Sequence, residues 1–72
     1  MAENNHSEIE EIGATAGRIW GFLNDNGGAS LNKLAKNLEV SRELALQSVG
    51  WLAREDKIVF EPAARGRLIR LK

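Results

Sequence analysis

Basic and amide side chains between residues 33 and 67 are of the types that bind nucleic acid. Arginine and lysine pair with phosphate, and arginine and glutamine also hydrogen-bond base edges in the major groove. The candidate residues are Lys33, Lys36, Arg42, Gln47, Arg54, Arg65 and Arg67. The same residue types also cover ordinary solvated surfaces, so their meaning depends on the elements that carry them.

Other kinds of chemistry have little support in the sequence. There is no cysteine, and the single histidine, His6, lies in a polar amino-terminal segment. These residues offer neither a thiolate metal site nor a nucleophile with its base. We therefore expect no enzyme activity, catalytic residue, metal site, cofactor or small-molecule substrate.

Length and composition predict one small cytoplasmic domain. A chain of 72 residues buries only about 60% of the surface that it exposes when unfolded, so a partner subunit would stabilise it. The lack of cysteine is typical of a reducing compartment. No apolar run approaches the roughly 20 residues that span a bilayer, so we expect no membrane association.

Charge is balanced overall but separated along the chain. Ten basic and ten acidic residues cancel, whereas a nucleic-acid-binding domain usually carries a clear positive excess. The acidic end carries Glu3, Glu8, Glu10 and Glu11, and the basic end carries Arg65, Arg67, Arg70 and Lys72. The basic end fits a hairpin that meets phosphate, and it equally fits a solvated hairpin whose charges protect an exposed edge.

The segment 30–58 has the pattern of two short helices joined by a tight turn. Apolar residues recur at i, i+3, i+4 and i+7 over residues 31–38, and a second helical pattern covers residues 41–54. Ser30 and Ser41 precede these runs, where a hydroxyl can cap the first turn of a helix. The pattern predicts a helix-turn-helix.

A longer helix is predicted ahead of this motif. Ser7 begins an S-x-x-E capping box, and the polar run 24–28 ends the helix with glycine. Between them, one apolar stripe consists of Ile12, Ala16, Ile19, Trp20 and Leu23. We therefore expect residues 1–7 to be a disordered tail and residues 8–72 to form one domain.

Three glycines are spaced four residues apart on the predicted first helix. Gly13, Gly17 and Gly21 each cost roughly 1 kcal/mol relative to alanine in a helix interior. One interpretation is a smooth groove against which another backbone packs, such as that of a second subunit. The other is that Gly13 lies at a frayed start of the helix and the remaining two face neighbours within the fold.

Two runs rich in β-forming residues follow the helices. Residues 57–61 and 67–71 are separated by a segment that combines Pro62 with Gly66, which predicts a β-hairpin with a loop of about four residues. Ala29-Ser30 could add a very short third strand. The predicted fold is α+β: three helices and a carboxyl-terminal hairpin wing, in the order of a winged helix-turn-helix.

The helix predicted over residues 41–54 is apolar over an unusually wide arc. Leu44, Leu46 and Trp51 widen its buried face to roughly 220°, about twice an ordinary amphipathic stripe. One interpretation is an interface with a partner or a second copy, with Trp51 as its anchor. The other is that Trp51 and Trp20 fill the core against the hairpin residues Ile58 and Phe60.

The polar arc of this helix is poorly suited to reading base sequence. Arg42 and Gln47 could reach bases and Arg54 could reach phosphate. Glu43 lies among them, and its negative charge would repel the phosphate backbone of DNA. We therefore expect mainly phosphate contacts. Arg65-Gly66-Arg67 is comparable with arginine arms that enter minor grooves, or is a turn glycine between two solvated arginines.

A distinctive set of residues lies in the helix predicted over residues 31–38, in the turn after it and at the end of the helix predicted over residues 41–54. They are Leu34-Ala35, Leu38, Val40-Ser41 and, over residues 50–58, G-W-L-A-R-E-D-K-I. With these residues the chain resembles the winged helix-turn-helix superfamily, and more narrowly a small prokaryotic group of stand-alone winged-helix domains that carry the last stretch. The resemblance extends from about Ile9 to Leu71.

This resemblance implies that residues 41–54 form the recognition helix and residues 63–67 form the wing. It also implies that double-stranded DNA is the partner and that dimerisation is common. Glu39 departs from the usual pattern, because many helix-turn-helix proteins have glycine in that turn. A left-handed Glu39 would be strained by roughly 1 kcal/mol.

Two functions remain open from the sequence. The first is a DNA-binding or transcription-associated module, homodimeric and dependent mainly on phosphate contacts. The second is a protein interaction adaptor that uses the apolar flank of the helix over residues 41–54 and binds no nucleic acid.

Overall fold

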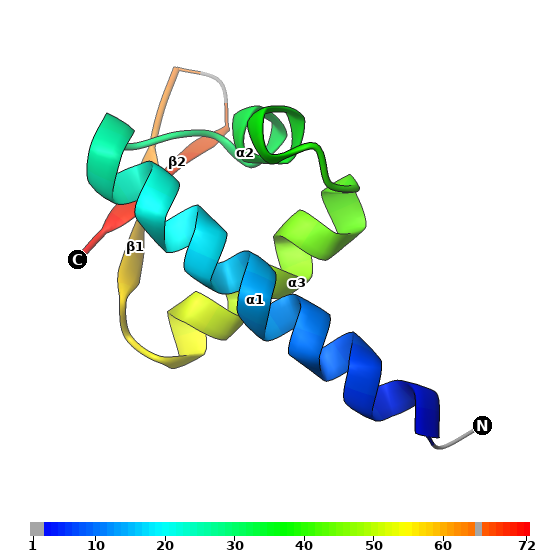
Figure 1. Ribbon diagram of the computed structural model, residues 1–72. Helices are drawn as coiled ribbons and strands as arrows, with labels where there is room; N and C mark the ends of the chain where they lie inside the picture. The colour runs from blue at the N-terminus through cyan, green and yellow to red at the C-terminus, as the bar shows by residue number, and fades with distance from the viewer. Residues whose placement is uncertain (1–2, 65) are drawn as a thin grey trace.

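The computed structural model describes residues 3–64 and 66–72, with side chains described from residue 7 onward. Three helices precede a two-stranded antiparallel hairpin (Figure 1). The elements are α1 (Glu3–Asn26), α2 (Leu31–Leu38), α3 (Arg42–Arg54), β1 (Ile58–Pro62) and β2 (Arg67–Leu71). This is the α+β winged-helix architecture that the sequence predicts.

Helix α1 begins earlier than predicted. It starts at Glu3, so Ser7 lies inside the helix and the expected start at its capping box is wrong. Residues 1 and 2 of the expected tail lie outside the described residues.

The carboxyl-terminal end of α1 is followed by Gly27, which has φ +82°. This is the left-handed conformation predicted for the glycine that closes the helix.

Two of the three glycines of α1 have open space beside them, and the third contacts Trp51. No atom would lie within 4 Å of a Cβ added to Gly17 or Gly21, and the nearest atom to one on Gly13 is Cζ2 of Trp51 at 3.9 Å. Gly13 is in the middle of α1. The interpretation in which Gly13 lies at a frayed start and the others face neighbours within the fold is therefore wrong.

Serine caps define the starts of α2 and α3, as predicted. The Ser30 hydroxyl accepts a hydrogen bond from the Lys33 backbone N–H at 3.1 Å, and the Ser41 hydroxyl accepts one from the Leu44 N–H at 3.0 Å. These bonds satisfy backbone donors that have no partner inside the helix.

The turn between α2 and α3 contains Glu39 in the left-handed region, with φ 58° and ψ 45°. The Val40 N–H donates to the Ala35 carbonyl at 3.1 Å, and the Glu39 N–H donates to the Lys36 carbonyl at 3.3 Å. This is the hydrogen-bonding pattern of a Schellman helix end, which usually has glycine at the left-handed position. Glu39 therefore adopts the strained conformation, and two backbone hydrogen bonds hold it.

The hairpin pairs Ile58 with Leu71 at one end and Pro62 with Arg67 at the other. In the loop after Pro62, the Ala63 N–H donates to the Gly66 carbonyl at 3.1 Å, and Gly66 has φ +80°. The predicted third strand is a single bridge in which Ala29 and Ile69 exchange two hydrogen bonds, of 3.0 and 2.8 Å. This bridge ties the hairpin to the segment that leads into α2.

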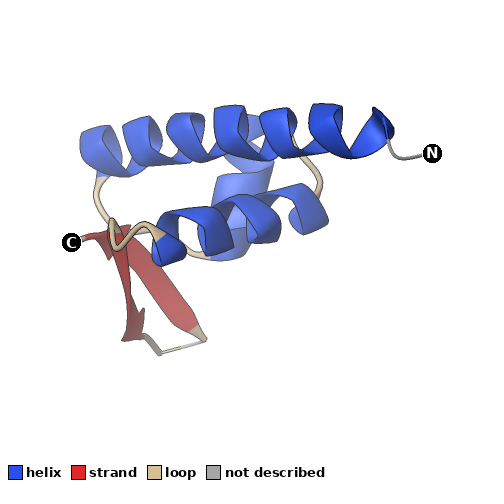
Figure 2. Cartoon of the chain, turned by 90° about the horizontal axis from the view of Figure 1, so that it is seen from below, coloured by secondary structure: helices blue, strands red, loops and turns tan. Residues whose placement is uncertain are grey.

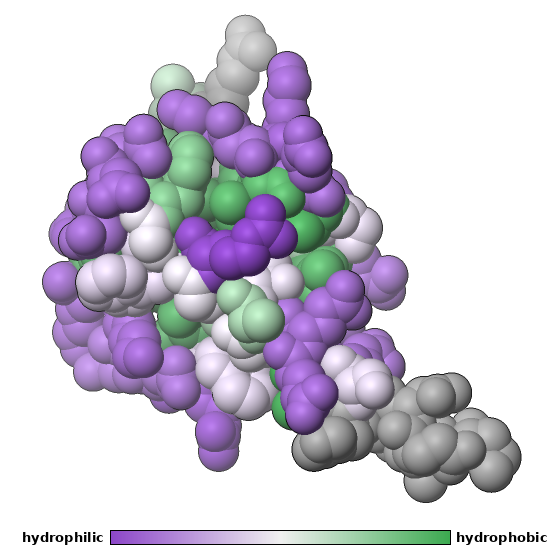
Figure 3. Space-filling view, in the orientation of Figure 1, coloured by the Kyte–Doolittle hydropathy of each residue, from purple (hydrophilic) through white to green (hydrophobic). Residues whose placement is uncertain are grey.

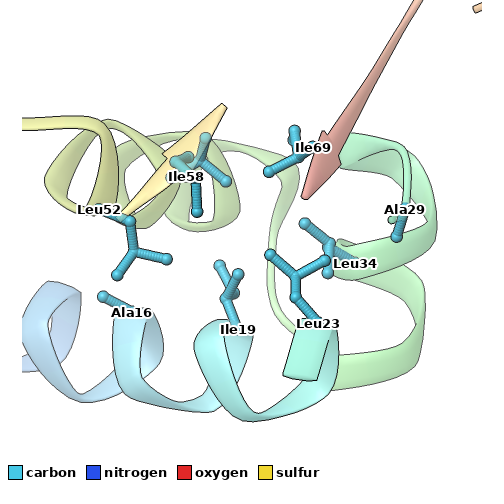
Figure 4. Close-up of a cluster of buried hydrophobic side chains, with 9 residues drawn as sticks. Ala16, Ile19, Leu23, Ala29, Leu34, Leu52, Ile58 and Ile69 are labelled. Atoms are coloured by element: carbon cyan, nitrogen blue, oxygen red, sulfur yellow. The ribbon is translucent and has the colours of Figure 1, made fainter. Parts of the chain in front are cut away.

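The core lies where the three helices meet the inner face of the hairpin. Ile19 and Leu23 of α1 point toward Leu34, Leu52 and the hairpin residues (Figure 4). The remaining buried apolar residues are Ala16, Ala29, Ala45, Val49, Ile58 and Ile69. The hairpin extends from the bundle near the carboxyl-terminal end of α1 (Figure 2).

Neither tryptophan belongs to this core. Trp20 is 41% exposed, Trp51 39% and Phe60 41%, so the interpretation in which both indoles fill the core against Ile58 and Phe60 is wrong. Small and medium-sized side chains fill the contact between α1 and α3, which leaves both indoles at its rim.

Candidate nucleic-acid interface

A hollow of about 260 Å³ lies between the start of α2, the outer face of α3 and the hairpin. Its apolar floor comes from all three elements, with Leu31, Val49 and Ile69 among the contributors. Its polar lining is Ser30, Asn32, Arg42 and Arg67. None of the described residues that line it is acidic.

Arg42 and Arg67 reach this hollow from positions far apart in the sequence, and each guanidinium has a partner. Arg42, the first residue of α3, donates from Nε to Oδ1 of Asn32 at 2.8 Å. The Arg67 guanidinium lies over the ring of Phe60, 5.0 Å from its centroid. Such contacts restrict the side chains before a ligand arrives, which lowers the entropy cost of binding an anion.

Two large exposed apolar side chains belong to the lining of the hollow. Leu46 is 55% exposed and Phe60 is 41% exposed, and both line the hollow. A helix that reads bases usually presents polar side chains here, although an aliphatic side chain can contact a thymine methyl group. The hollow therefore combines two arginines, one amide and one hydroxyl with a largely apolar lining.

The other candidate residues do not line the hollow. Lys33 and Lys36 are exposed on α2, and Gln47 and Arg54 are exposed on α3. Arg65 lies outside the described residues. Of the predicted DNA-binding residues, the structure thus brings together Arg42 and Arg67 and leaves the described remainder as separate exposed side chains.

Sequence reasoning missed Ser30 and Asn32 as lining residues and Phe60 as the platform for Arg67. The contact between Phe60 and Arg67 has a signal in the sequence, because Phe60 pairs with Ile69 and Arg67 is two residues before it. Such diagonal neighbours share one face of an antiparallel pair. The contact between Asn32 and Arg42 has no such signal, because it depends on the angle between two helices.

The structure separates the three predicted interface residues. Leu46 lines the hollow at the hairpin, Trp51 is next to Gly13 of α1, and Leu44 is half-buried. The wide apolar arc of α3 is thus divided between two sides of the helix.

The described residues show neither a cluster of metal ligands nor a membrane span. In that part of the chain, no three histidine, cysteine, aspartate or glutamate side chains gather where they could hold a metal ion. None of the helices described is long and apolar enough to cross a membrane.

The model of a family described as winged helix-turn-helix domain (DUF2582) matches residues 2–71. The chain belongs to this family. That assignment confirms the winged helix-turn-helix family predicted from the sequence.

Two similar proteins extend the comparison. An uncharacterized protein of Methanocaldococcus jannaschii is 37% identical over 65 residues, which cover 86% of this chain and 91% of that protein. A protein of Bacteroides thetaiotaomicron with a solution NMR structure is 39% identical and superimposes with a TM-score of 0.78, covering 86% of this chain and 76% of that one.

Proposed function

We propose that this protein is a cytoplasmic, non-enzymatic module that binds double-stranded DNA as a homodimer, mainly through phosphate contacts, in association with transcription. The observation that supports the proposal most is the placement of Arg42 and Arg67 on one hollow between α3 and the hairpin, with no acidic residue among its described lining. Winged-helix domains present a helix and a hairpin to DNA in this way.

In the proposed complex, the first turn of α3 enters the major groove and the hairpin follows the adjacent backbone. Arg42 and Arg67 hold phosphates on either side of the hollow. Lys33 and Lys36 on α2, Arg54 at the end of α3 and Arg65 in the hairpin loop add further phosphate contacts. Because phosphate contacts carry no base information, they position the protein without selecting a sequence.

Sequence preference is expected to be weak. Gln47 is the one amide on the exposed arc of α3 that could reach a base edge, and Leu46 beside it offers only an apolar contact. Glu43, in the first turn of α3, opposes phosphate. Balanced charge over the whole chain further lowers non-specific affinity at ordinary salt.

The experiment is a titration of labelled duplex with the wild type and with the double variant Arg42→Ala/Arg67→Ala, at several salt concentrations between about 50 and 200 mM. We expect binding to weaken steeply with salt and the double variant to reduce the logarithmic salt slope by about 2, one for each lost phosphate contact.

Arg70→Ala is the matched control, because Arg70 is on the same strand but pairs with Glu61 at 2.6 Å on the other face of the hairpin. It removes one positive charge outside the hollow, half of the charge that the double variant removes. Absence of binding even at low salt, or an equal loss in Arg70→Ala, would contradict the proposal.

A protein interaction adaptor is the second candidate, and the exposure of Leu46 favours it, since a large aliphatic side chain at the centre of a binding face is typical of protein interfaces. Leu46→Gln separates the two functions. A DNA-binding protein should keep or increase its affinity for duplex in this variant. An adaptor should show no duplex binding, either as the wild type or as the Leu46→Gln variant.

A further inference from the structure

A second hollow, of about 430 Å³, lies between α1 and the carboxyl-terminal end of α3. Its floor and walls include Gly13, Ala16 and Gly17 of α1 together with the indoles of Trp20 and Trp51. We call it the tryptophan groove. It shares no residue with the hollow at the hairpin.

Gly17, in the centre of α1, has no neighbour in the described fold that requires a glycine. A Cβ on Gly17 would meet open space, so no contact in the described fold requires glycine there. An alanine would stabilise the helix interior by roughly 1 kcal/mol. A glycine that the single subunit does not need indicates a requirement for close approach from outside.

The exposed apolar residues of α1 continue the line of these glycines. At 100° per residue, Ile9, Gly13, Gly17 and Trp20 fall within an arc of roughly 80°, beside the buried stripe. Ile9 is 51% exposed and Trp20 is 41% exposed. Large side chains at both ends of the line thus enclose a smooth centre.

The amino-terminal part of α1 extends past α3 and the hairpin, so it has little of its own chain to pack against (Figures 1 and 2). The surface over α1 shows white and pale green atoms together with hydrophilic side chains, one of which crosses its middle (Figure 3). Ile9 is in the first third of α1, and its side chain is 51% exposed.

We propose that a second copy of this chain occupies the tryptophan groove, with the two α1 helices crossing antiparallel about a two-fold axis between Gly13 and Gly17. In that alignment Gly13 faces Gly17 of the partner subunit, and Ile9 lies against Trp20 of the partner subunit. The overhanging turns of each α1 then cover the groove of the other copy.

The internal symmetry of α1 is what selects a second copy as the occupant. A two-fold interface must be complementary to itself. Residue 15 is the midpoint of Gly13 and Gly17, and Ile9 and Trp20 lie six and five residues from it on opposite sides. The protruding side chains and the smooth centre are therefore spaced so that each copy fits the other.

This inference gives an interface to the homodimer in the proposed function, and it uses none of the residues proposed to bind DNA. Its test measures mass in the absence of DNA, so its failure and the failure of DNA binding are distinguishable. Sedimentation velocity over a range of protein concentrations should show a monomer that becomes a dimer as concentration rises.

Gly17→Gln is the decisive variant. Because a side chain at Gly17 meets open space in the subunit, the variant should fold with unchanged or increased thermal stability, yet its dimer dissociation constant should rise at least tenfold. Gly50→Gln is the matched control: Gly50 is an exposed glycine of α3 with open space around it, outside the groove. It should leave the dimer unchanged.

Cysteine cross-linking tests the direction of the helices, because the chain has no native cysteine. A mixture of the Gly13→Cys and Gly17→Cys variants should form mainly the mixed disulfide, whereas parallel helices would give mainly the two homodisulfides. A wild type that stays monomeric at every concentration, a dimer that survives Gly17→Gln, or a preference for homodisulfides would each overturn the proposal.

Discussion

Glu39 holds a backbone conformation that costs free energy for any residue with a Cβ. Its φ of 58° is in the left-handed region, where the penalty for an L-residue is roughly 1 kcal/mol or more. The Schellman hydrogen bonds at Ala35 and Lys36 keep it there. The sequence identified the position and its cost, but the turn geometry that settled it depends on how α2 and α3 pack.

Glu39→Gly should therefore stabilise the protein. We expect the free energy of unfolding to rise by roughly 0.5–1 kcal/mol, because relief of strain exceeds the extra entropy that glycine gives to the unfolded chain. Urea denaturation measures it. Glu43→Gly is the control, since it introduces the same glycine into an ordinary turn of α3 and should destabilise by roughly 1 kcal/mol. Equal effects at both positions would contradict the strain at Glu39.

The start of a helix could be predicted from the sequence for α2 and α3 but not for α1. Ser30 and Ser41 cap α2 and α3 as predicted, because a serine ahead of an apolar-periodic run has a local signature. Ser7 has the same signature, but α1 starts at Glu3. The difference arises because helix can extend through polar residues that no apolar periodicity marks.

Capping can be checked residue by residue. Ser41→Ala should lower the free energy of unfolding by roughly 1 kcal/mol, because the N–H of Leu44 loses its acceptor. Ser7→Ala should change the free energy of unfolding by no more than a few tenths of 1 kcal/mol, since Ser7 is an exposed residue inside α1. Thermal or urea unfolding of both variants measures the difference. A large loss in Ser7→Ala would show that α1 begins at Ser7.

The candidate sites were less accessible from sequence than the elements that carry them. The seven candidate polar residues could be selected by type, but only the angle between α3 and the hairpin places Arg42 and Arg67 on one hollow. The apolar arc of α3 was visible as a wide stripe. Its division into Leu46 on one side and Trp51 on the other depends on where α1 and β2 pack, which side-chain periodicity does not contain.

At the scale of the whole molecule, α3 separates two hollows with different proposed partners. Leu46 and Val49 face the hollow proposed for DNA, and Trp51 and Leu52 face the tryptophan groove. A dimer formed through α1 would therefore leave both DNA-binding hollows uncovered. Two such hollows on one assembly can engage two segments of the same duplex, which increases apparent affinity without any new contact.

This coupling predicts a dependence on duplex length. Gly17→Gln should bind a duplex of about 10 bp, the length of one half-site, with the affinity of the wild type. On a duplex of about 30 bp it should bind at least tenfold more weakly than the wild type, because a monomer gains no avidity. Its salt slope on the longer duplex should fall to about half, since half as many phosphates are neutralised.

The short duplex is the internal control for this prediction, because it reports on the hollow of each subunit alone. An equal loss of affinity on both duplexes would mean that Gly17→Gln disturbs the DNA-binding hollow itself. Equal affinity of the wild type and the variant on the longer duplex would mean that the two hollows of a dimer do not reach one duplex together. Only a loss confined to the longer duplex connects the tryptophan groove with DNA binding.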